Sequence, residues 1–461
     1  MKEISKDQVD ISTDIAGVYC SSPITIGSHD PDKPWYPATS LERWVNLFVK
    51  YYKAGAGHLI TPSIVPEPEE EPPEFYKNKG RRHYIGRYFP FYHKDWWLSA
   101  RKGREFWNDE WFDQFEFPVG AFWTGPTSIF VKKKDGEKLI KGMLEKIDTE
   151  KCPIMGNVLV EQPIVEKWVE HAKWFEELGV QVLELNFGCP CGAFELPPGV
   201  PKEDVRFGLL LGVMPKMIET ITREVVKNTH IPSYVKITPE TGYPGILMAA
   251  DAARKGGAKG VVTTHMGFAQ PPPDIWGDPP GKTPWPFMKT YPPATVTGPH
   301  ERFFMYKGVS LVHANFPDLD IEAGAGIVHP EHVVEAIFLG AKTVQSFSGI
   351  VWNGITFIKR CNEFLRYYMA KKGFKKIDDF RGFTVRKYFK PLELDDFIPC
   401  HAVVNEGKCT HCGRCIDNWC PAISETEDGL SATINKEECS GCGMCVMICP
   451  HAAISLVPWK D

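Results

Sequence analysis

Two runs of cysteines near the end of the chain limit its structure more than any other sequence feature. The first run is Cys409-x2-Cys412-x2-Cys415-x4-Cys420 and the second is Cys439-x2-Cys442-x2-Cys445-x3-Cys449, each followed by proline. In paired runs of this kind, three closely spaced thiolates hold one iron–sulfur cube, and the fourth cysteine reaches across to the other cube. The spacing therefore predicts two [4Fe–4S] clusters. The first is held by Cys409, Cys412, Cys415 and Cys449, and the second by Cys439, Cys442, Cys445 and Cys420.

Two zinc sites are the alternative, but zinc motifs seldom place three cysteines at this spacing before a proline. The first run has one residue more than usual before its fourth ligand, Cys420. Closely spaced cysteines at the spacing of metal ligands indicate cluster binding rather than disulfide bonds, which fits a protein in a reducing compartment. The start of the chain lacks the layout of a signal peptide, and no apolar run spans a bilayer. We expect a cytoplasmic protein without a membrane span.

Composition excludes several other classes of protein. The 461 residues are 43% hydrophobic and 24% charged, which is ordinary for a globular enzyme and unlike disordered or fibrous chains. The net charge is −5, and the sequence has no run of Lys and Arg of the kind that binds the phosphates of DNA or RNA. We therefore expect no nucleic-acid partner.

Before the cysteine runs, short apolar segments alternate with amphipathic helical stretches such as 164–178, 213–227 and 330–339. This alternation is typical of βα units around a parallel sheet. The strand candidates number eight: 22–26, 58–64, 153–158, 182–187, 233–238, 260–264, 319–323 and 343–347. Eight units favour a (β/α)8 TIM barrel in the α/β class, with an open doubly wound sheet as the alternative. We expect the barrel over 1–371, a linker over 372–400 and a bacterial ferredoxin-like domain over 401–461.

Two segments break the repeat. An insertion at about 66–123 is rich in aromatic residues, with 17 of the 57 Phe, Trp and Tyr between 75 and 123. It is either a small core that packs the insertion on the barrel or an aromatic lid over the active site. The second segment, 266–299, is rich in Pro and Gly and is typical of a long active-site loop.

Several strand ends carry motifs of one enzyme family. Asn186-Phe187-Gly188-Cys189-Pro190 ends the fourth strand, Lys236 lies in Val-Lys-Ile-Thr-Pro, and 281–286 reads Gly-Lys-Thr-Pro-Trp-Pro. Here the chain resembles the dihydropyrimidine dehydrogenase and class 1 dihydroorotate dehydrogenase family. The turn at 322–327 and the end of the eighth strand at 344–349 are similar to that family as well. The resemblance extends over most of residues 15–455.

The resemblance implies a flavin barrel that binds FMN. Loops after strands 7 and 8 of such barrels bind phosphate through backbone N–H groups, and Lys236 would place a cation beside the flavin ring. The alternative for Lys236 is a barrel-interior lysine paired with Glu184, and for Asn186 a turn-capping amide. The expected cofactor-binding residues are Ser22, Thr61, Asn157, Asn186, Lys236, Thr264, Gly324, Gly326, Ser346, Ser348 and Gly349.

Cys189 is the expected catalytic residue. A thiol of ordinary pKa is protonated at neutral pH, so it can donate a proton to a carbon while hydride reaches the neighbouring carbon. The cysteine at this position has that role in the pyrimidine enzymes. The alternatives are a buried structural thiol or a metal site shared with Cys191. His265 is a second catalytic candidate that would donate to a carbonyl or relay protons, with a structural histidine as its alternative.

The chain departs from the family at the positions that hold a pyrimidine. Pro62 replaces the lysine of the second strand, Gly188 replaces the serine before Cys189, and His265-Met266 replaces an Asn-Thr pair. Losing one polar partner of a buried ring costs about 1–3 kcal/mol. We therefore expect a cyclic or aromatic conjugated substrate other than uracil.

The motifs together predict an oxidoreductase acting on CH–CH groups. Electrons would pass through two [4Fe–4S] clusters to FMN, with Cys189 as proton donor. No strand–GxGxxG–helix unit for NAD is evident, so we expect an external ferredoxin or NAD(P)H-oxidising flavoprotein, and a homo-oligomer. The alternatives are a non-catalytic electron-transfer subunit and a flavoenzyme like tRNA dihydrouridine synthase.

Overall fold

The chain forms two compact units, Met1–Phe389 and Lys390–Asp461, which are described separately. The computed structural model describes residues 2–29, 41–66, 87–90, 121–124, 131–160, 163–188, 211–264, 267–269, 273, 278–281, 294–390, 398–416, 420–427 and 431–459. Within these residues, no helix has the length and apolar character needed to cross a bilayer.

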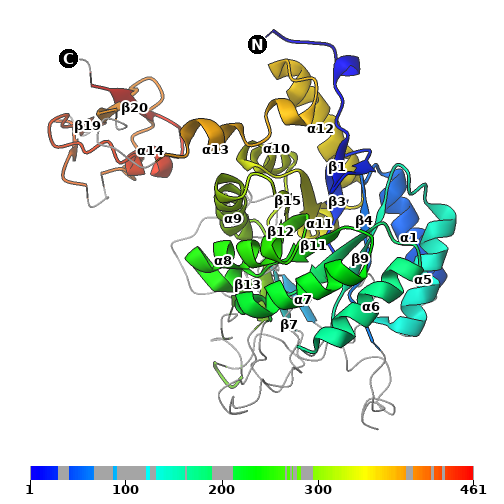
Figure 1. Cartoon of the computed structure of the whole chain (residues 1–461). Coiled ribbons are helices and arrows are strands. Elements are labelled where there is room, and N and C mark those ends of the chain that lie inside the picture. Colours follow the sequence, from blue (N-terminus) through cyan, green and yellow to red (C-terminus); the bar gives the residue numbers. More distant parts are fainter. Residues whose placement is uncertain are drawn as a thin grey trace. The chain divides into compact units, whose positions relative to one another are not determined.

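The first unit is built around eight parallel strands (Figure 1). In chain order they are β3 (Ile24–Ile26), β4 (Leu59–Ile60), β9 (Ile154–Val158), β10 (Val182–Asn186), β11 (Ser233–Lys236), β12 (Gly260–Thr263), β15 (Asp320–Ala323) and β16 (Thr343–Ser346). From β4 to β16 each strand pairs with the next of the eight, and β16 pairs with β3. The predicted TIM barrel is therefore confirmed, and each of these strands lies within one of the expected segments.

The barrel closes where β3 meets the start of β4. The Gly57 N–H donates to the Ile24 carbonyl at 2.9 Å, which brings the first and second strands together. A Cβ atom on residue 57 would lie only 1.7 Å from the Ser22 carbonyl oxygen, so this close approach requires glycine. Beyond β4, the short strands β5 (Ile64–Val65) and β8 (Val131–Lys132) extend the sheet at its rim.

Helices cover the outside of the strands, as Figure 1 shows for α6 to α9. The long ones are α1 (Leu41–Lys53), α5 (Lys133–Lys146), α6 (Val165–Glu177), α7 (Pro215–Asn228), α8 (Gly242–Lys255), α9 (Glu301–Asn315), α10 (Pro330–Leu339) and α12 (Thr356–Lys372). Each turns an apolar stripe toward the strands, as Phe175 of α6 does against Gly156 of β9. The main hydrophobic core therefore lies between helices and strands.

A second, smaller core fills the amino-terminal end of the barrel. The hairpin of β1 (Thr13–Ile15) and β2 (Val18–Cys20) packs Ile15 and Cys20 against inward-facing residues of the strands, among them Met155 and Tyr234. The hairpin therefore closes this end, and the polar interior described below lies toward the opposite, carboxyl end.

The two segments outside the repeat meet in one antiparallel sheet. Strands β6 (Arg87–Pro90) and β7 (Ala121–Thr124) come from the insertion, and β13 (Gly267–Ala269) and β14 (Ala294–Thr297) come from the second loop. Their order is β13-β14-β7-β6. The sequence did not predict this pairing. Most of the aromatic residues of the insertion lie outside the described residues.

The stretch 372–400, expected as a linker, is divided between the two units. After α12, Phe374, Ile377 and Phe380 are buried in the barrel core, and a short helix, α13 (Phe383–Tyr388), ends the first unit. The apolar residues in this stretch explain why its first half packs on the barrel.

The described residues of the small second unit form two antiparallel strand pairs and one short helix. Strand β17 (Cys400–Val404) pairs with β20 (Ile454–Pro458), β18 (Ile423–Glu425) pairs with β19 (Ala432–Ile434), and α14 spans Met444–Ile448. Its described core consists of only five buried residues, one of them Cys445. A core of this size gives little stability without cross-links or metal.

Candidate functional site

The eight predicted ligand cysteines of the second unit gather as two sets of four around two cavities. One cavity is lined by Cys409, Cys412, Cys415 and Cys449. The other is lined by Cys420, Cys439, Cys442 and Cys445. Each set thus takes three thiols from one run and the fourth from the other, which is the crossing arrangement expected from the sequence. No three His, Cys, Asp or Glu side chains among the described residues are close enough for a single metal ion. Four thiolates are the ligands of one [4Fe–4S] cluster, and each cavity is lined by four cysteines.

Hydrogen bonds to sulfur favour the thiolate form of individual cysteines in both sets, whereas burial raises the pKa of Cys415 and of Cys445. Backbone N–H groups donate to Cys449 at 3.2 Å and to Cys439 at 3.3 Å. The His411 backbone N–H and the Ser431 hydroxyl lower the pKa of Cys409. Since thiolates are the ligands of iron–sulfur clusters, the donor set fits two such groups.

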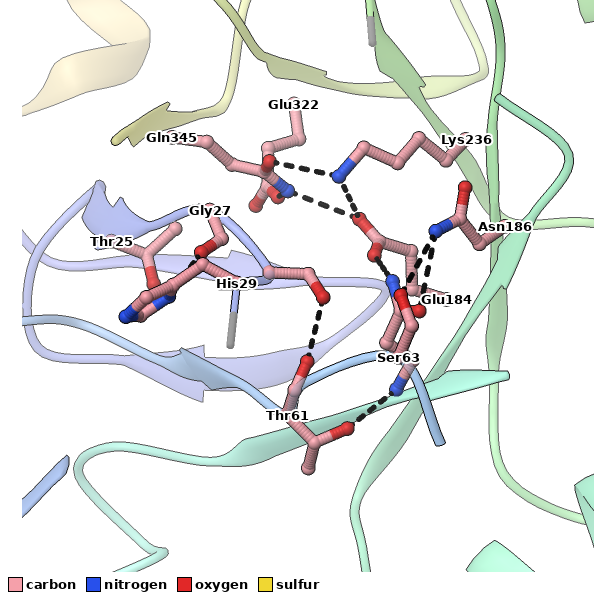
Figure 2. A network of polar contacts seen from close by, with 12 residues as sticks. Thr25, Gly27, His29, Thr61, Ser63, Glu184, Asn186, Lys236, Glu322 and Gln345 are labelled. Carbon is pink, nitrogen blue, oxygen red and sulfur yellow. Dashed lines mark hydrogen bonds and ion pairs between the residues drawn. The ribbon is translucent and has the colours of Figure 1, made fainter. Parts of the chain in front are cut away.

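In the barrel, the carboxyl ends of three neighbouring strands bring polar side chains together. The register aligns Asn186 of β10 with Lys236 of β11. The Asn186 amide donates to Asn157 of β9 at 3.3 Å, and the Asn157 backbone N–H donates to the Thr61 hydroxyl at 2.9 Å. All four residues are buried. Strand alternation turns these positions inward, so four of the expected cofactor-binding residues share one interior site (Figure 2).

Lys236 is the buried cation of this site. Its side chain is 6% exposed, and its ammonium lies 3.4 Å from Glu184 Oε1 and 3.4 Å from Gln345 Oε1 (Figure 2). The pairing with Glu184 is therefore present. Both contacts are long, and an ammonium has three N–H donors, so the pairing is compatible with a further acceptor at the barrel mouth.

A second charged pair lies deeper in the barrel. The side chains of His58 and Glu322 are both 0% exposed, and His58 Nε2 lies 2.7 Å from Glu322 Oε2. Burial alone would lower the pKa of His58, but the negative charge of Glu322 together with hydrogen bonds to Cys20 and Glu322 outweighs it and raises this pKa to about 10. Burial would likewise raise the pKa of Glu322, but the charge of His58 together with hydrogen bonds from His58, Thr343 and Gln345 holds it below its ordinary value. The two carboxylates, Glu184 and Glu322, are thus balanced by two cations.

The loop after β15 is shaped by close contacts. A Cβ atom on Gly326, whose φ is +76°, would lie 2.2 Å from the Arg302 backbone nitrogen at the start of α9. A Cβ atom on Gly324 would lie 2.9 Å from the Thr264 carbonyl oxygen. The Thr264 hydroxyl is buried and has no hydrogen-bond partner among the described residues. A glycine loop beside an unsatisfied hydroxyl at the carboxyl end of the barrel fits a bound ligand with polar atoms.

The other predicted site residues are placed as follows. Ser346 ends β16 and donates to the Ile327 carbonyl at 2.7 Å, while Ser348 and Gly349 begin the short helix α11 (Ser348–Asn353). Ser22 precedes β3, and its hydroxyl donates to Asn362 of α12 at 2.8 Å. It therefore lies at the amino end of its strand, away from the other candidates. Cys189 and His265, the expected catalytic residues, lie outside the described residues.

Sequence reasoning assigned no role to His58, Glu322 or Gln345. A usable signal was present, because Glu322 lies directly between the apolar residues Ile321 and Ala323 in a predicted strand. A charged residue at such an inward position must find a partner in the barrel interior. The partner itself, His58, is 264 residues away and could be found only from the structure.

Comparison with known proteins agrees with both units. The family model for a 4Fe-4S dicluster domain matches residues 401–450. The chain is 27% identical over 255 residues to the NAD-dependent dihydropyrimidine dehydrogenase subunit PreA of Escherichia coli, covering 54% of this chain and 58% of the relative. The predicted resemblance is confirmed.

Two further relatives are also named as dehydrogenases. The dihydroorotate dehydrogenase B (NAD(+)) catalytic subunit of Thermoplasma volcanium is 25% identical, covering 51% of this chain and 70% of the relative. The chloroplastic dihydropyrimidine dehydrogenase (NADP(+)) of Arabidopsis thaliana is 23% identical, covering 56% of this chain and 59% of the relative. The chain thus aligns with 58% of the length of the first of these relatives, and all three are dehydrogenases.

Proposed function

We propose that this chain is an FMN- and iron–sulfur-dependent oxidoreductase. It reduces or forms an activated carbon–carbon double bond in a cyclic or conjugated substrate. The observation that carries the proposal is the buried Lys236 ammonium at the carboxyl end of β11. The two sets of four thiols in the second unit, and the dehydrogenase names of the relatives, support it.

The residues at the barrel mouth suit a flavin mononucleotide. Lys236 would stabilise the negative charge that reduction places on the ring, and Asn186 and Thr264 would hydrogen-bond the ring edge. The loop of Gly324 and Gly326 lets a phosphate approach the backbone closely. When bound, FMN exchanges hydride with a substrate and single electrons with iron–sulfur clusters.

Cys189 is the proposed proton donor. It follows Asn186, the last residue of β10, by three positions, so the sequence carries it onto the loop at the carboxyl end of the barrel. A thiol with a pKa near its reference value of about 8.5 holds its proton at neutral pH and can give it to a substrate carbon. His265, after β12, is proposed to contact the substrate, and its presence with Met266 favours a substrate other than a pyrimidine.

The proposed electron path needs a partner. Two [4Fe–4S] clusters form a route for single electrons, which would come from a cytoplasmic ferredoxin or an NAD(P)H-oxidising flavoprotein. The name of the Escherichia coli relative, an NAD-dependent subunit, agrees with such an assembly.

The test is a comparison of Cys189→Ala with Cys191→Ala, a matched control two residues away. Both proteins are purified anaerobically, assayed for FMN and iron, and screened with cyclic enones and aromatic acids for reoxidation of the reduced flavin. We expect both to keep their cofactors. Only Cys189→Ala should lose turnover, by about 10²- to 10⁴-fold, the usual contribution of a general acid. Wild-type turnover in Cys189→Ala would contradict the proposed role.

A further inference from the structure

The buried residues behind Lys236 do more than balance its charge. We propose that Glu322, acting through the amide of Gln345, fixes the position of the Lys236 ammonium and so sets the reduction potential of the flavin. This inference rests on the proposed function, because it requires FMN beside Lys236. Glu322 is then a positioning residue, which acts on the flavin only through Gln345 and Lys236.

The first step is the orientation of the Gln345 amide. Its Nε2 group donates to Glu184 Oε1 at 3.1 Å and also to Glu322 Oε1. Two carboxylates thus take both N–H donors of the amide, and the Oε1 atom faces Lys236 at 3.4 Å (Figure 2). The inverted amide would turn its carbonyl oxygen toward two carboxylates and its N–H groups toward an ammonium, which is unfavourable on both sides.

The second step is the state of Glu322 itself. This carboxylate is fully buried. Its Oε2 atom accepts a hydrogen bond from the Thr343 hydroxyl at 2.6 Å and lies 2.7 Å from His58 Nε2. Since His58 supplies the compensating positive charge, the charge of Lys236 is not needed to neutralise Glu322. A buried carboxylate without such a partner would draw the ammonium inward or would be neutralised.

The third step connects this arrangement to the flavin. Among the described residues Lys236 has two acceptors, Glu184 and Gln345, and both are buried. Glu184 aligns with Tyr234, two residues nearer the amino end of β11 than Lys236, so it lies on the side away from the barrel mouth. If the Gln345 amide turns, Lys236 faces a donor and moves toward Glu184, away from the mouth. A cation further from the ring stabilises reduced flavin less than before. The reduction potential therefore falls.

The main variant is Glu322→Gln, in which the new amide can donate to the Gln345 carbonyl oxygen and permit the inverted orientation. We expect the affinity for reduced FMN relative to oxidised FMN to fall about tenfold, which is about 30 mV for a two-electron couple. A second variant, Gln345→Met, leaves the Glu322–His58 pair in place and removes the amide. We expect a shift of the same direction. This variant decides the question if Glu322→Gln does not fold.

The control is Tyr234→Phe. It removes a partly buried hydrogen bond of 3.0 Å to Asp320 at the amino end of the barrel interior, a bond in which neither Gln345 nor Lys236 takes part. The measurement is an anaerobic redox titration of each holoprotein, followed in the flavin absorbance, with FMN content determined in parallel. The proposal predicts lowered flavin potentials in Glu322→Gln and Gln345→Met and the wild-type potential in Tyr234→Phe.

Two results would overturn it. One is an unchanged flavin potential in Gln345→Met or Glu322→Gln with FMN still bound. The other is an equal shift in Tyr234→Phe, which would mean that any loss of a buried polar contact has this effect. Wild-type protein without FMN is a distinct result, which would overturn the proposed function and this inference with it.

Discussion

The His58–Glu322 pair makes the stability of the barrel depend on pH in a direction that the structure fixes. The pKa of His58 is raised from its ordinary value of about 6.5 to about 10 in the folded protein. Below pH 6.5, His58 is protonated in both folded and unfolded chains, so its stabilising effect is fully present. As the pH rises toward 10, the unfolded chain gives up this proton more easily than the folded one, and the free energy of unfolding falls.

The shift in the His58 pKa sets the size of this pH dependence. Each unit of difference between the pKa of His58 in the folded and in the unfolded chain corresponds to about 1.4 kcal/mol, so the whole difference contributes at most about 5 kcal/mol to the free energy of unfolding. Between pH 7 and 8.5 the expected loss is about 2 kcal/mol. Toward the upper end of this interval the Cys20 thiol, whose pKa is raised by burial in the folded protein, begins to ionise in the unfolded chain.

The matched protein is the double variant His58→Gln with Glu322→Gln, which keeps hydrogen-bonding groups but carries no ionisable pair. Urea unfolding of both holoproteins is followed in the tryptophan fluorescence at several pH values, and the pH dependences are compared. Other titrating groups are common to both proteins and cancel in the difference. Wild-type protein should lose about 2 kcal/mol more than the variant over the interval. Equal pH dependences would refute a protonated His58.

Three further perturbations test other parts of the structure. Gly57→Ala should destabilise the barrel by about 3 kcal/mol or more, measured by thermal unfolding, because the added methyl group would collide with the Ser22 carbonyl. Lys236→Met should lower the free energy of unfolding by about 3–5 kcal/mol, since it leaves a buried carboxylate without its cation, and a shift near zero would contradict the pairing. Cys409→Ala and Cys449→Ala should each remove about half of the iron and the same electron paramagnetic resonance signal, and combining them should remove no more. A double variant without any iron would mean that the two thiols serve different clusters.

The strands of the barrel could be predicted because their signal is local. Alternation of apolar segments with amphipathic helices repeats along the chain, and helix α10 begins and ends at the predicted residues. The thiol sets were predictable for the same reason, since the spacing within each run fixes three ligands at once. The crossing of Cys420 and Cys449 follows from the paired pattern rather than from either run alone.

The interior network could not be predicted in the same way. Glu322 of β15 and His58, which directly precedes β4, contact each other across the barrel from positions far apart in the sequence, and the residues next to each of them in the chain are apolar. Which inward residue meets which depends on the register of the strands and the closure of the barrel at Gly57. The sequence also does not show which end of a strand a predicted site residue occupies. Ser22 is part of a correctly placed segment, but it lies at the amino end of β3, where its hydroxyl contacts a helix.

The pairing of the two irregular segments also depends on tertiary structure. Strand β7 of the insertion aligns Phe122 with Val296 of β14, although neither segment carries a turn signal that points to the other. Two loops from the same end of a barrel are close in space whatever their separation in the chain. The sheet that they form could therefore be found only from the structure.

The most direct test of the account is the cofactor content of the full-length protein purified without oxygen. A barrel that holds a flavin and a second unit that holds two iron–sulfur cubes should give about one FMN and about eight irons per chain, with a broad absorbance near ~400 nm. Colourless protein, or protein with iron but no flavin after anaerobic purification, would contradict it.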